Sequence, residues 1–126
     1  MTIAEVAKKF GLTPDTLRYY ERIGLLRNIN RSPGGIRDYT DEDCRWVSYM
    51  KCMRAAGVSV ETLIEYVRLF DQGAETIAAR KKLLLEQREQ IVARINEMND
   101  TLAKLDWKLD GYEERMLKFE EEHFKR

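Results

Sequence analysis

An apolar residue recurs every seven positions along the last third of the chain, and this repeat restricts the fold more than any other feature. One row comprises Leu84, Ile91, Met98, Leu105, Tyr112 and Phe119. A second row, three positions earlier, comprises Ile95, Leu102, Leu109 and Met116. Two such rows flanked by charges are typical of the a and d positions of a coiled coil. The pattern predicts one long helix from Ala74 nearly to the end.

A helix of that length spans roughly 60–70 Å and carries more apolar surface than a small domain can cover. A chain of 126 residues has room for one compact domain and an extension. The stripe therefore needs another helix, and a second copy of the chain is the simplest partner. We expect a homodimer with these a and d residues at its interface. Gly111 does not fit the pattern, since glycine costs a helix interior roughly 1 kcal/mol.

The first part of the chain contains two short helical segments separated by Gly11. Thr2 and Glu5 have the spacing of a capping box, and an apolar stripe follows them. Thr13 is a capping residue before Pro14, which suits the first position of a second helix. Two helices joined by a glycine-containing turn form the helix-turn-helix pattern, in which the second helix enters the major groove of DNA.

The second helix carries four side chains that suit DNA, namely Thr16, Arg18, Tyr19 and Tyr20. Guanidinium and hydroxyl groups are what a helix needs to contact base edges and phosphates. For Tyr19 and Tyr20 an alternative stays open, in which half-buried rings only stabilise the domain. Downstream, the segment 31–39 (RSPGGIRDY) indicates two short strands around a Pro-Gly-Gly turn. Such a hairpin would be the wing of a winged helix-turn-helix.

Two further helices complete the first domain. Thr40 caps one that runs to about Ala56, and Ser59 caps another that ends near Gly73. We therefore expect a DNA-binding domain over residues 1–72 and a dimerisation helix over 73–126. The fold class is all-α dominated, with a small β-hairpin as the wing.

The net charge of zero hides an uneven distribution. Residues 1–40 contain seven Lys and Arg against four Asp and Glu, which leaves three positive charges in excess. This excess lies where phosphate contacts are expected. Chance is the plainer explanation for so modest a number, so the charge only supports the DNA-binding interpretation.

The sequence gives no sign of catalysis, a cofactor or a metal site. The single histidine, His123, lies in a charged tail, so neither a Ser-His-Asp arrangement nor a histidine-rich metal site is possible. Nothing indicates a signal peptide or a membrane-spanning run. Cys44 and Cys52 are eight residues apart on one expected helix, about 12 Å in rise, which is too far for a disulfide. Free thiols fit a reducing cytoplasm.

The segment 3–26 (IAEVAKKFGLTPDTLRYYERIGLL), followed by GGIRDYTDED, resembles the N-terminal domain of MerR-family transcription regulators. The resemblance runs from Ile3 to about Phe70. It implies a homodimer with antiparallel long helices on a palindromic promoter, where distortion of the DNA lets RNA polymerase use it. It also implies DNA contacts from Arg18, Tyr19 and Tyr20 and from Arg37 and Tyr39 of the wing.

The signal that such a regulator would receive is harder to read. The family's metal sensors use cysteines near the start of the long helix and in a loop after it, and neither segment has one here. MKCMRAAGVS, around Cys52, resembles the AdhR/NmlR branch of MerR-like regulators, which implies sensing of aldehydes or other electrophiles through this cysteine. The neighbouring Lys51 and Arg54 favour thiolate, whereas the nearby helix C-terminus opposes it. Cys44 is expected to be incidental.

Three alternatives remain at this point. In the first, Cys52 is a buried, inert thiol and the protein senses a small molecule non-covalently. In the second, the protein is a constitutive architectural protein that only bends DNA. The third and weakest alternative is a protein–protein module that uses the coiled coil alone.

Overall fold

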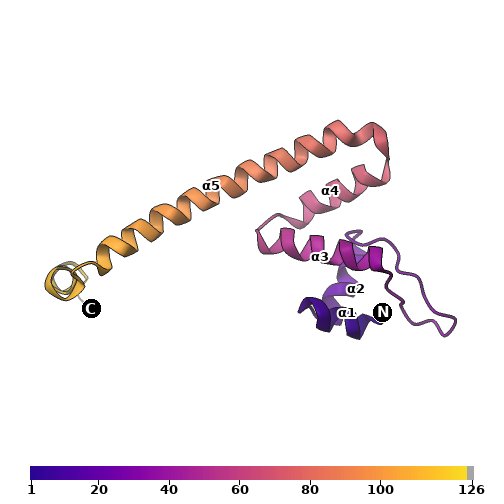
Figure 1. Ribbon diagram of the computed structural model, residues 1–126, viewed down its shortest axis with the longest axis horizontal. Helices are drawn as coiled ribbons and strands as arrows, with labels where there is room; N and C mark the ends of the chain where they lie inside the picture. Colours follow the sequence, from indigo (N-terminus) through magenta and orange to yellow (C-terminus); the bar gives the residue numbers. More distant parts are fainter. Residues whose placement is uncertain (125–126) are drawn as a thin grey trace. The chain divides into compact units, whose positions relative to one another are not determined.

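The computed structural model describes residues 1–124, which form a series of helices (Figure 1). The first four are α1 (Ile3–Phe10), α2 (Pro14–Arg22), α3 (Asp41–Ala55) and α4 (Val60–Asp71). After them come a 3-10 turn η1 (Ala74–Thr76), the long α5 (Ile77–Leu109), a π-helical turn η2 (Tyr112–Met116) and α6 (Leu117–His123). The chain forms two compact units, Met1–Leu85 and the part from Glu86 onward, and each is described by itself.

The helix starts that the sequence predicts are confirmed. The Thr2 hydroxyl accepts a hydrogen bond from the Glu5 N–H at 3.2 Å, and the Glu5 carboxylate accepts one from the Thr2 N–H at 2.9 Å. Side-chain oxygens likewise cap the next three helices, at Thr13, Thr40 and Ser59. These bonds satisfy N–H groups that the first turn of any helix leaves without a partner.

Apolar residues from α1 to α4 form the core of the first unit. Val6, Leu17 and Val47 have no exposed surface, and they bring α1, α2 and α3 together. Leu25 and Leu26, just after α2, are also buried and close this core on the side of the following loop. The recognition helix of the expected helix-turn-helix is therefore fixed through its inner face.

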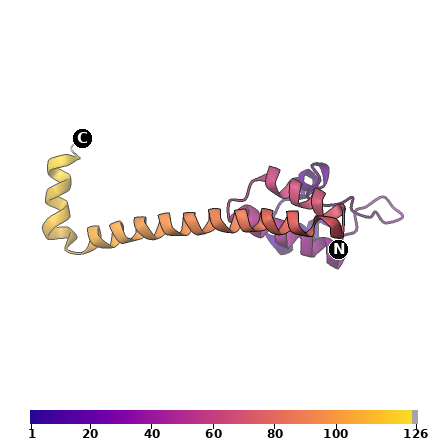
Figure 2. The ribbon, with the colours of Figure 1, turned by 90° about the horizontal axis from the view of Figure 1, so that it is seen from above.

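The expected β-hairpin wing is not confirmed. The segment after α2 is a loop that extends away from the helices (Figures 1 and 2), and Arg31 and Arg37 form one isolated antiparallel bridge in it. The Ser32 N–H donates to the Ile36 carbonyl at 2.7 Å, and no strand occurs within residues 1–124. Arms this short hold too few ladder bonds to form regular strands.

The end of the loop pairs with the start of the chain instead of continuing a hairpin. The Tyr39 N–H donates to the Met1 carbonyl at 2.8 Å, and the Met1 ammonium group donates to the Tyr39 carbonyl at 2.8 Å. The same ammonium group lies 3.1 Å from a carboxylate oxygen of Asp38. The N-terminus therefore anchors the loop at the point where it returns to α3.

The prediction of a single helix from Ala74 nearly to the end is wrong in its last part. α5 ends at Leu109, and Gly111 has φ 65° and ψ 32°. This left-handed conformation is one that glycine adopts at little cost and that often ends helices. Gly111, which the heptad pattern left unexplained, is the residue at which the helix breaks.

After the break the chain turns, and α6 runs away from the axis of α5 (Figure 2). The Glu120 carboxylate lies 2.8 Å from the Lys108 ammonium group and accepts a hydrogen bond from the Tyr112 hydroxyl. These two bonds hold the pKa of Glu120 below its usual value. The Arg115 guanidinium lies over the Trp107 ring, 4.5 Å from its centroid. An ion pair, a hydrogen bond and a cation–π contact therefore hold this corner.

Along α5 the a and d residues remain on the surface. Leu102 and Leu105 are 55% and 52% exposed, and Met98 is 73% exposed. Beyond the break the a and d residues no longer share one exposed face, since Met116 is buried. None of the helices within residues 1–124 is both long and apolar enough to cross a membrane.

Candidate nucleic-acid interface

The outer face of α2 presents polar side chains that are positioned by the packing of its inner face. The Arg18 guanidinium is solvent-exposed and lies 2.8 Å from the Asp15 carboxylate, one turn earlier. Thr16 is half-buried, and its hydroxyl lies 2.9 Å from that of Thr13. Tyr19 is 40% exposed. Three of the four α2 side chains expected to meet DNA therefore reach the surface of the helix.

Tyr20 and Tyr39 are placed differently from what was expected. Tyr20 is 7% exposed and Tyr39 is 2% exposed, and both belong to the core. The Tyr39 hydroxyl is buried and has no hydrogen-bond partner within residues 1–124. Burial first, and the Glu21 carboxylate second, raise the pKa of Tyr39. The phosphate contact expected of Tyr39 does not fit this packing, and for Tyr20 the packing favours the alternative of a stabilising ring.

Arg37 makes a contact that the sequence did not suggest. Its Nε donates to a carboxylate oxygen of Glu21 at 2.8 Å, and both side chains are largely buried, at 22% and 14% exposed. The other Glu21 oxygen accepts from the Ile29 N–H at 3.2 Å. Glu21, on α2, thus bonds to two points of the following loop, and its bond to Arg37 positions the loop relative to α2.

Two further cations were missed as candidate site residues. The Arg22 guanidinium lies over the Tyr19 ring, 5.4 Å from its centroid, and extends the polar face of α2. Arg31 is exposed in the loop, where it donates to the Gly35 carbonyl at 2.9 Å. Arg22 follows Arg18 by four residues, so helical spacing alone places both on one face.

The two cysteines differ in exposure. Cys44 is buried, and its thiol sulfur lies 4.0 Å from the Met1 sulfur. Cys52 is exposed, so the alternative of a buried thiol at this position is wrong. Cys52 follows Arg45 and Tyr49 at intervals of seven and three residues, which places all three along one side of α3.

Comparison with known proteins identifies the family of the chain. Residues 1–69 match the family described as MerR HTH family regulatory protein, and residues 45–108 match the one described as MerR, DNA binding. The chain belongs to the MerR family. It is accordingly a transcriptional regulator of the MerR type rather than an enzyme.

Individual members of the family resemble most of the chain. It is 53% identical over 92 residues to the HTH-type transcriptional regulator AdhR of Bacillus subtilis (strain 168), a match that covers 73% of this chain and 66% of AdhR. A MerR family regulator from Listeria monocytogenes has a similar crystal structure, with a TM-score of 0.86, 43% identity and coverage of 97% of this chain and 92% of that one.

A third relative was solved with DNA. It is HiNmlR, a MerR family regulator lacking the sensor domain, whose crystal structure is bound to promoter DNA. The TM-score is 0.82 at 32% identity, and the match covers 92% of each chain. The similarity extends beyond the helix-turn-helix and includes α5.

Proposed function

We propose that this MerR-type regulator binds a palindromic promoter site as a homodimer, with one helix-turn-helix in each half-site. The observation that carries the proposal is the two-sided character of α2. Its inner face is fixed in the core by Leu17, while Arg18 and Tyr19 are exposed on its outer face. A recognition helix needs this combination, because its base-reading side chains must be free while its backbone is held.

The apolar stripe of α5 supports the proposed dimer. Its a and d residues from Leu84 to Leu109 are half-buried or exposed in the single chain, and a contiguous apolar stripe of this kind marks an interaction site. Pairing with the same stripe of a second copy buries both. Two-fold symmetry of the protein then corresponds to two-fold symmetry of the DNA site.

In our proposal Arg18 and Thr16 face bases or phosphates, and Tyr19 binds the DNA backbone. Arg37 contributes by orienting the loop, with part of its guanidinium left for a phosphate. Tyr20 and Tyr39 support the domain from within. Activation would come from distortion of the promoter DNA, because RNA polymerase can then use the distorted promoter. RNA polymerase would be an indirect partner, in the cytoplasm.

Arg18→Ala tests this placement, with Arg68→Ala as a matched control. Each arginine is exposed and paired with a carboxylate three residues earlier on its helix, Asp15 and Glu65 respectively. Arg18→Ala should weaken promoter binding by about 1–3 kcal/mol, measured by fluorescence anisotropy, if it makes a bidentate base contact. Arg68→Ala should bind like wild type. Equal affinities for all three proteins would remove α2 from the DNA interface.

We further propose that Cys52 is the sensor of aldehydes or other electrophiles, as the family resemblance implies. Its exposure supports this, because a reagent can reach the sulfur without unfolding α3. With an aldehyde, the thiolate sulfur bonds to the carbonyl carbon, and the carbonyl oxygen takes up a proton to give a hemithioacetal. The added group would change the packing around α3 and so the geometry of the two DNA-binding units.

The cysteine pair supplies its own control. Cys52→Ser should still bind the promoter but should not activate a reporter when cells are exposed to an aldehyde. Cys44→Ser should respond like wild type, since Cys44 is buried. Mass spectrometry after exposure should find the adduct on Cys52. Full induction of Cys52→Ser would favour a non-covalent effector, and a promoter that never responds would favour a constitutive architectural protein.

A further inference from the structure

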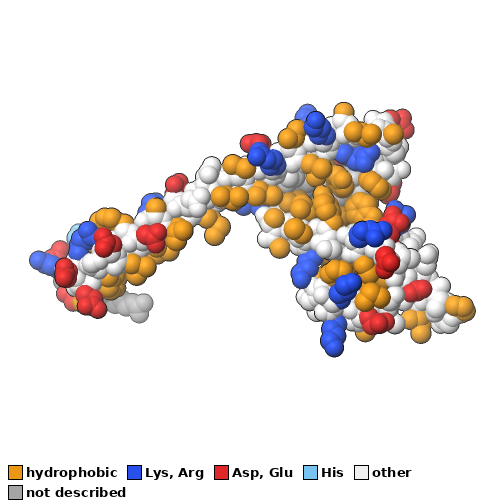
Figure 3. Space-filling model, in the orientation of Figure 1, with side chains coloured by type: hydrophobic (Ala, Val, Ile, Leu, Met, Phe, Trp, Pro, Cys, Tyr) orange, Lys and Arg blue, Asp and Glu red, His pale blue; other side chains and the backbone are white. Residues whose placement is uncertain are grey.

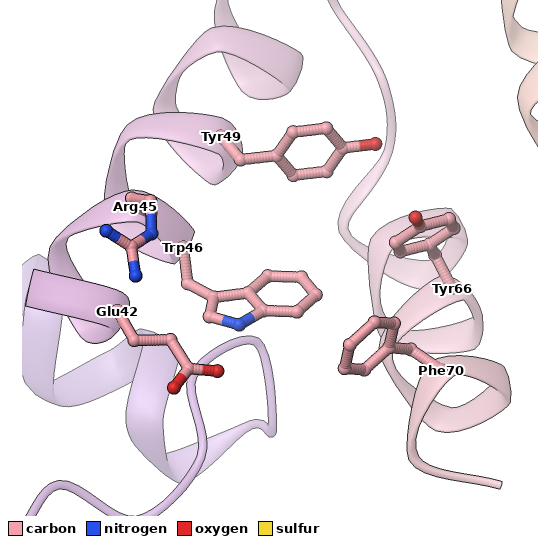
Figure 4. Close-up of a pocket in the computed structure, with 6 residues that line it drawn as sticks. All are labelled: Glu42, Arg45, Trp46, Tyr49, Tyr66 and Phe70. Atoms are coloured by element: carbon pink, nitrogen blue, oxygen red, sulfur yellow. The ribbon is translucent and has the colours of Figure 1, made fainter. Parts of the chain in front are cut away.

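Four aromatic side chains face one another across a pocket in the first unit (Figure 4). Trp46 and Tyr49 come from α3, and Tyr66 and Phe70 come from α4. The Trp46 and Phe70 rings meet edge to face with centroids 5.1 Å apart, and the Tyr49 and Tyr66 centroids are 5.9 Å apart. The pocket has a volume of about 380 Å³, which is sufficient for a small molecule.

These rings are not part of the closed core. Phe70 is 37% exposed, and the other three are half-buried. Hydrophobic side chains gather on this face over α3 and α4 (Figure 3). Aromatic rings gain most from full burial and from offset or edge-to-face contact with another ring. A flat, conjugated molecule therefore suits the pocket better than a branched aliphatic one.

The polar groups at the pocket determine which charge it accepts. The Glu42 carboxylate is already engaged by the Arg27 guanidinium at 3.1 Å. Arg45 has no polar partner among the residues that the structure describes, and neither do the hydroxyls of Tyr49 and Tyr66. Burial raises the pKa of Tyr49, so its hydroxyl stays protonated at neutral pH. The free groups are a cation and two hydroxyl donors, which suit an anionic or carbonyl oxygen.

We propose that this pocket binds planar, conjugated carboxylates, with the flat part among the four rings and the carboxylate at Arg45. A guanidinium pairs well with a carboxylate because its N–H groups match the two oxygens. An aromatic cation would be repelled by Arg45. This inference goes beyond the proposed function, because it requires neither Cys52 nor DNA.

The chain's two tryptophans provide the measurement. Trp46 lines the pocket, whereas Trp107 lies in the second unit, so their two indole N–H signals in a ¹H–¹⁵N spectrum report a site and an internal control. A Trp107→Phe variant assigns the signals. Cinnamate, planar and anionic, is the probe, titrated into the full-length protein without DNA. The Trp46 signal should shift and saturate in the millimolar range or below, as for a ligand of this size, while the Trp107 signal stays in place.

Ligand and protein controls sharpen the result. Cyclohexanecarboxylate keeps the charge without the flat conjugated system, and benzyltrimethylammonium keeps the ring but reverses the charge. Each should bind at least about tenfold more weakly than cinnamate, and Arg45→Gln should weaken cinnamate binding about tenfold. Arg68→Gln, at an exposed arginine elsewhere on α4, should leave binding unchanged. No Trp46 shift, an equal shift of both tryptophans, or equal binding of the three compounds would overturn the proposal.

Discussion

The first unit and the long helix α5 use apolar residues of the same kind in opposite ways. Leu17 and Val47, at helical intervals in α2 and α3, have no exposed surface. Leu102 and Leu105, at equally regular intervals in α5, are more than half exposed. The core of the first unit covers these residues within one chain, whereas α5 leaves a stripe exposed, which we propose a second copy of the chain covers. Periodicity identifies an apolar face in both regions, but only the size of the surroundings decides what covers it.

The largest effect should come from placing a charge on the α5 stripe. Leu102→Glu replaces an apolar side chain on each copy, and each loss should cost about 1.5–3 kcal/mol of association free energy. We expect the wild type to sediment as a dimer and the variant to sediment as a monomer at the same concentration. Ala93→Glu is the matched control, because heptad spacing places Ala93 on the opposite face of α5. Dimers of Leu102→Glu as stable as wild type would show that the stripe is not the dimer interface.

The second effect is the loss of a leucine side chain from the core of the first unit, which should lower the stability of each chain by itself. Leu17→Ala should lower the free energy of unfolding by about 2–5 kcal/mol, the usual cost of a cavity at a fully buried leucine. Measured by urea denaturation, this loss should not depend on protein concentration, whereas the loss in Leu102→Ala should. If the loss of unfolding free energy depended equally on protein concentration in both variants, the core would not be independent of the contacts between chains.

A smaller effect tests how Glu21 holds the loop. Glu21→Gln keeps the acceptor for the Ile29 N–H but removes the charge that faces Arg37. Loss of one hydrogen bond between charged groups should cost about 1–2 kcal/mol of stability. If Glu21 positions the loop for DNA, promoter affinity should also fall, although Glu21 itself is not among the residues proposed to contact DNA. A Glu21→Gln variant that binds DNA more tightly would indicate that Glu21 competes with phosphate for Arg37.

The smallest effect concerns the Tyr39 hydroxyl. Because it is buried without a partner within residues 1–124, Tyr39→Phe should raise the unfolding free energy by up to about 1 kcal/mol and leave promoter affinity unchanged. A tenfold loss of affinity would instead mean that the hydroxyl reaches a phosphate in the complex.

The same residue predicts a pH dependence. The pKa of Tyr39 is raised above its ordinary value of 10.0, so its contribution to stability is present below pH 10.0 and is lost as the pH rises through the folded pKa. Tyr39→Phe should therefore lose less stability than wild type above pH 10.0. Chemical denaturation at several pH values checks this, and identical losses in the two proteins would contradict it.

The sequence predicted well where the controlling interactions are local. The caps at Thr2 and Ser59 depend on residues three apart, so they could be predicted from spacing alone. The break at Gly111 was missed because the heptad repeat continues past it, although the glycine was visible as an inconsistency. At Gly111 the preference of a single glycine for the left-handed conformation outweighed the heptad repeat.

Features that depend on distant parts of the chain could not be predicted. The bonds of Tyr39 to Met1 and of Arg37 to Glu21 join residues 38 and 16 positions apart. No spacing rule relates such pairs, so a polar loop residue and a core residue look alike in the sequence. The aromatic pocket was missed for the same reason: its Trp46 and Phe70 come together only when α3 and α4 pack.

Selection of binding sites from a pool of random DNA tests the central claim most directly. The wild-type protein should enrich one inverted repeat whose two halves are related by a two-fold axis, as expected for a dimer with one recognition helix per half-site. Leu102→Glu should enrich at most a single half-site, and Arg18→Ala should lose the preference at the bases that Arg18 reads. Enrichment of no defined sequence by the wild-type protein, or of the same full repeat by Leu102→Glu as a monomer, would contradict the account.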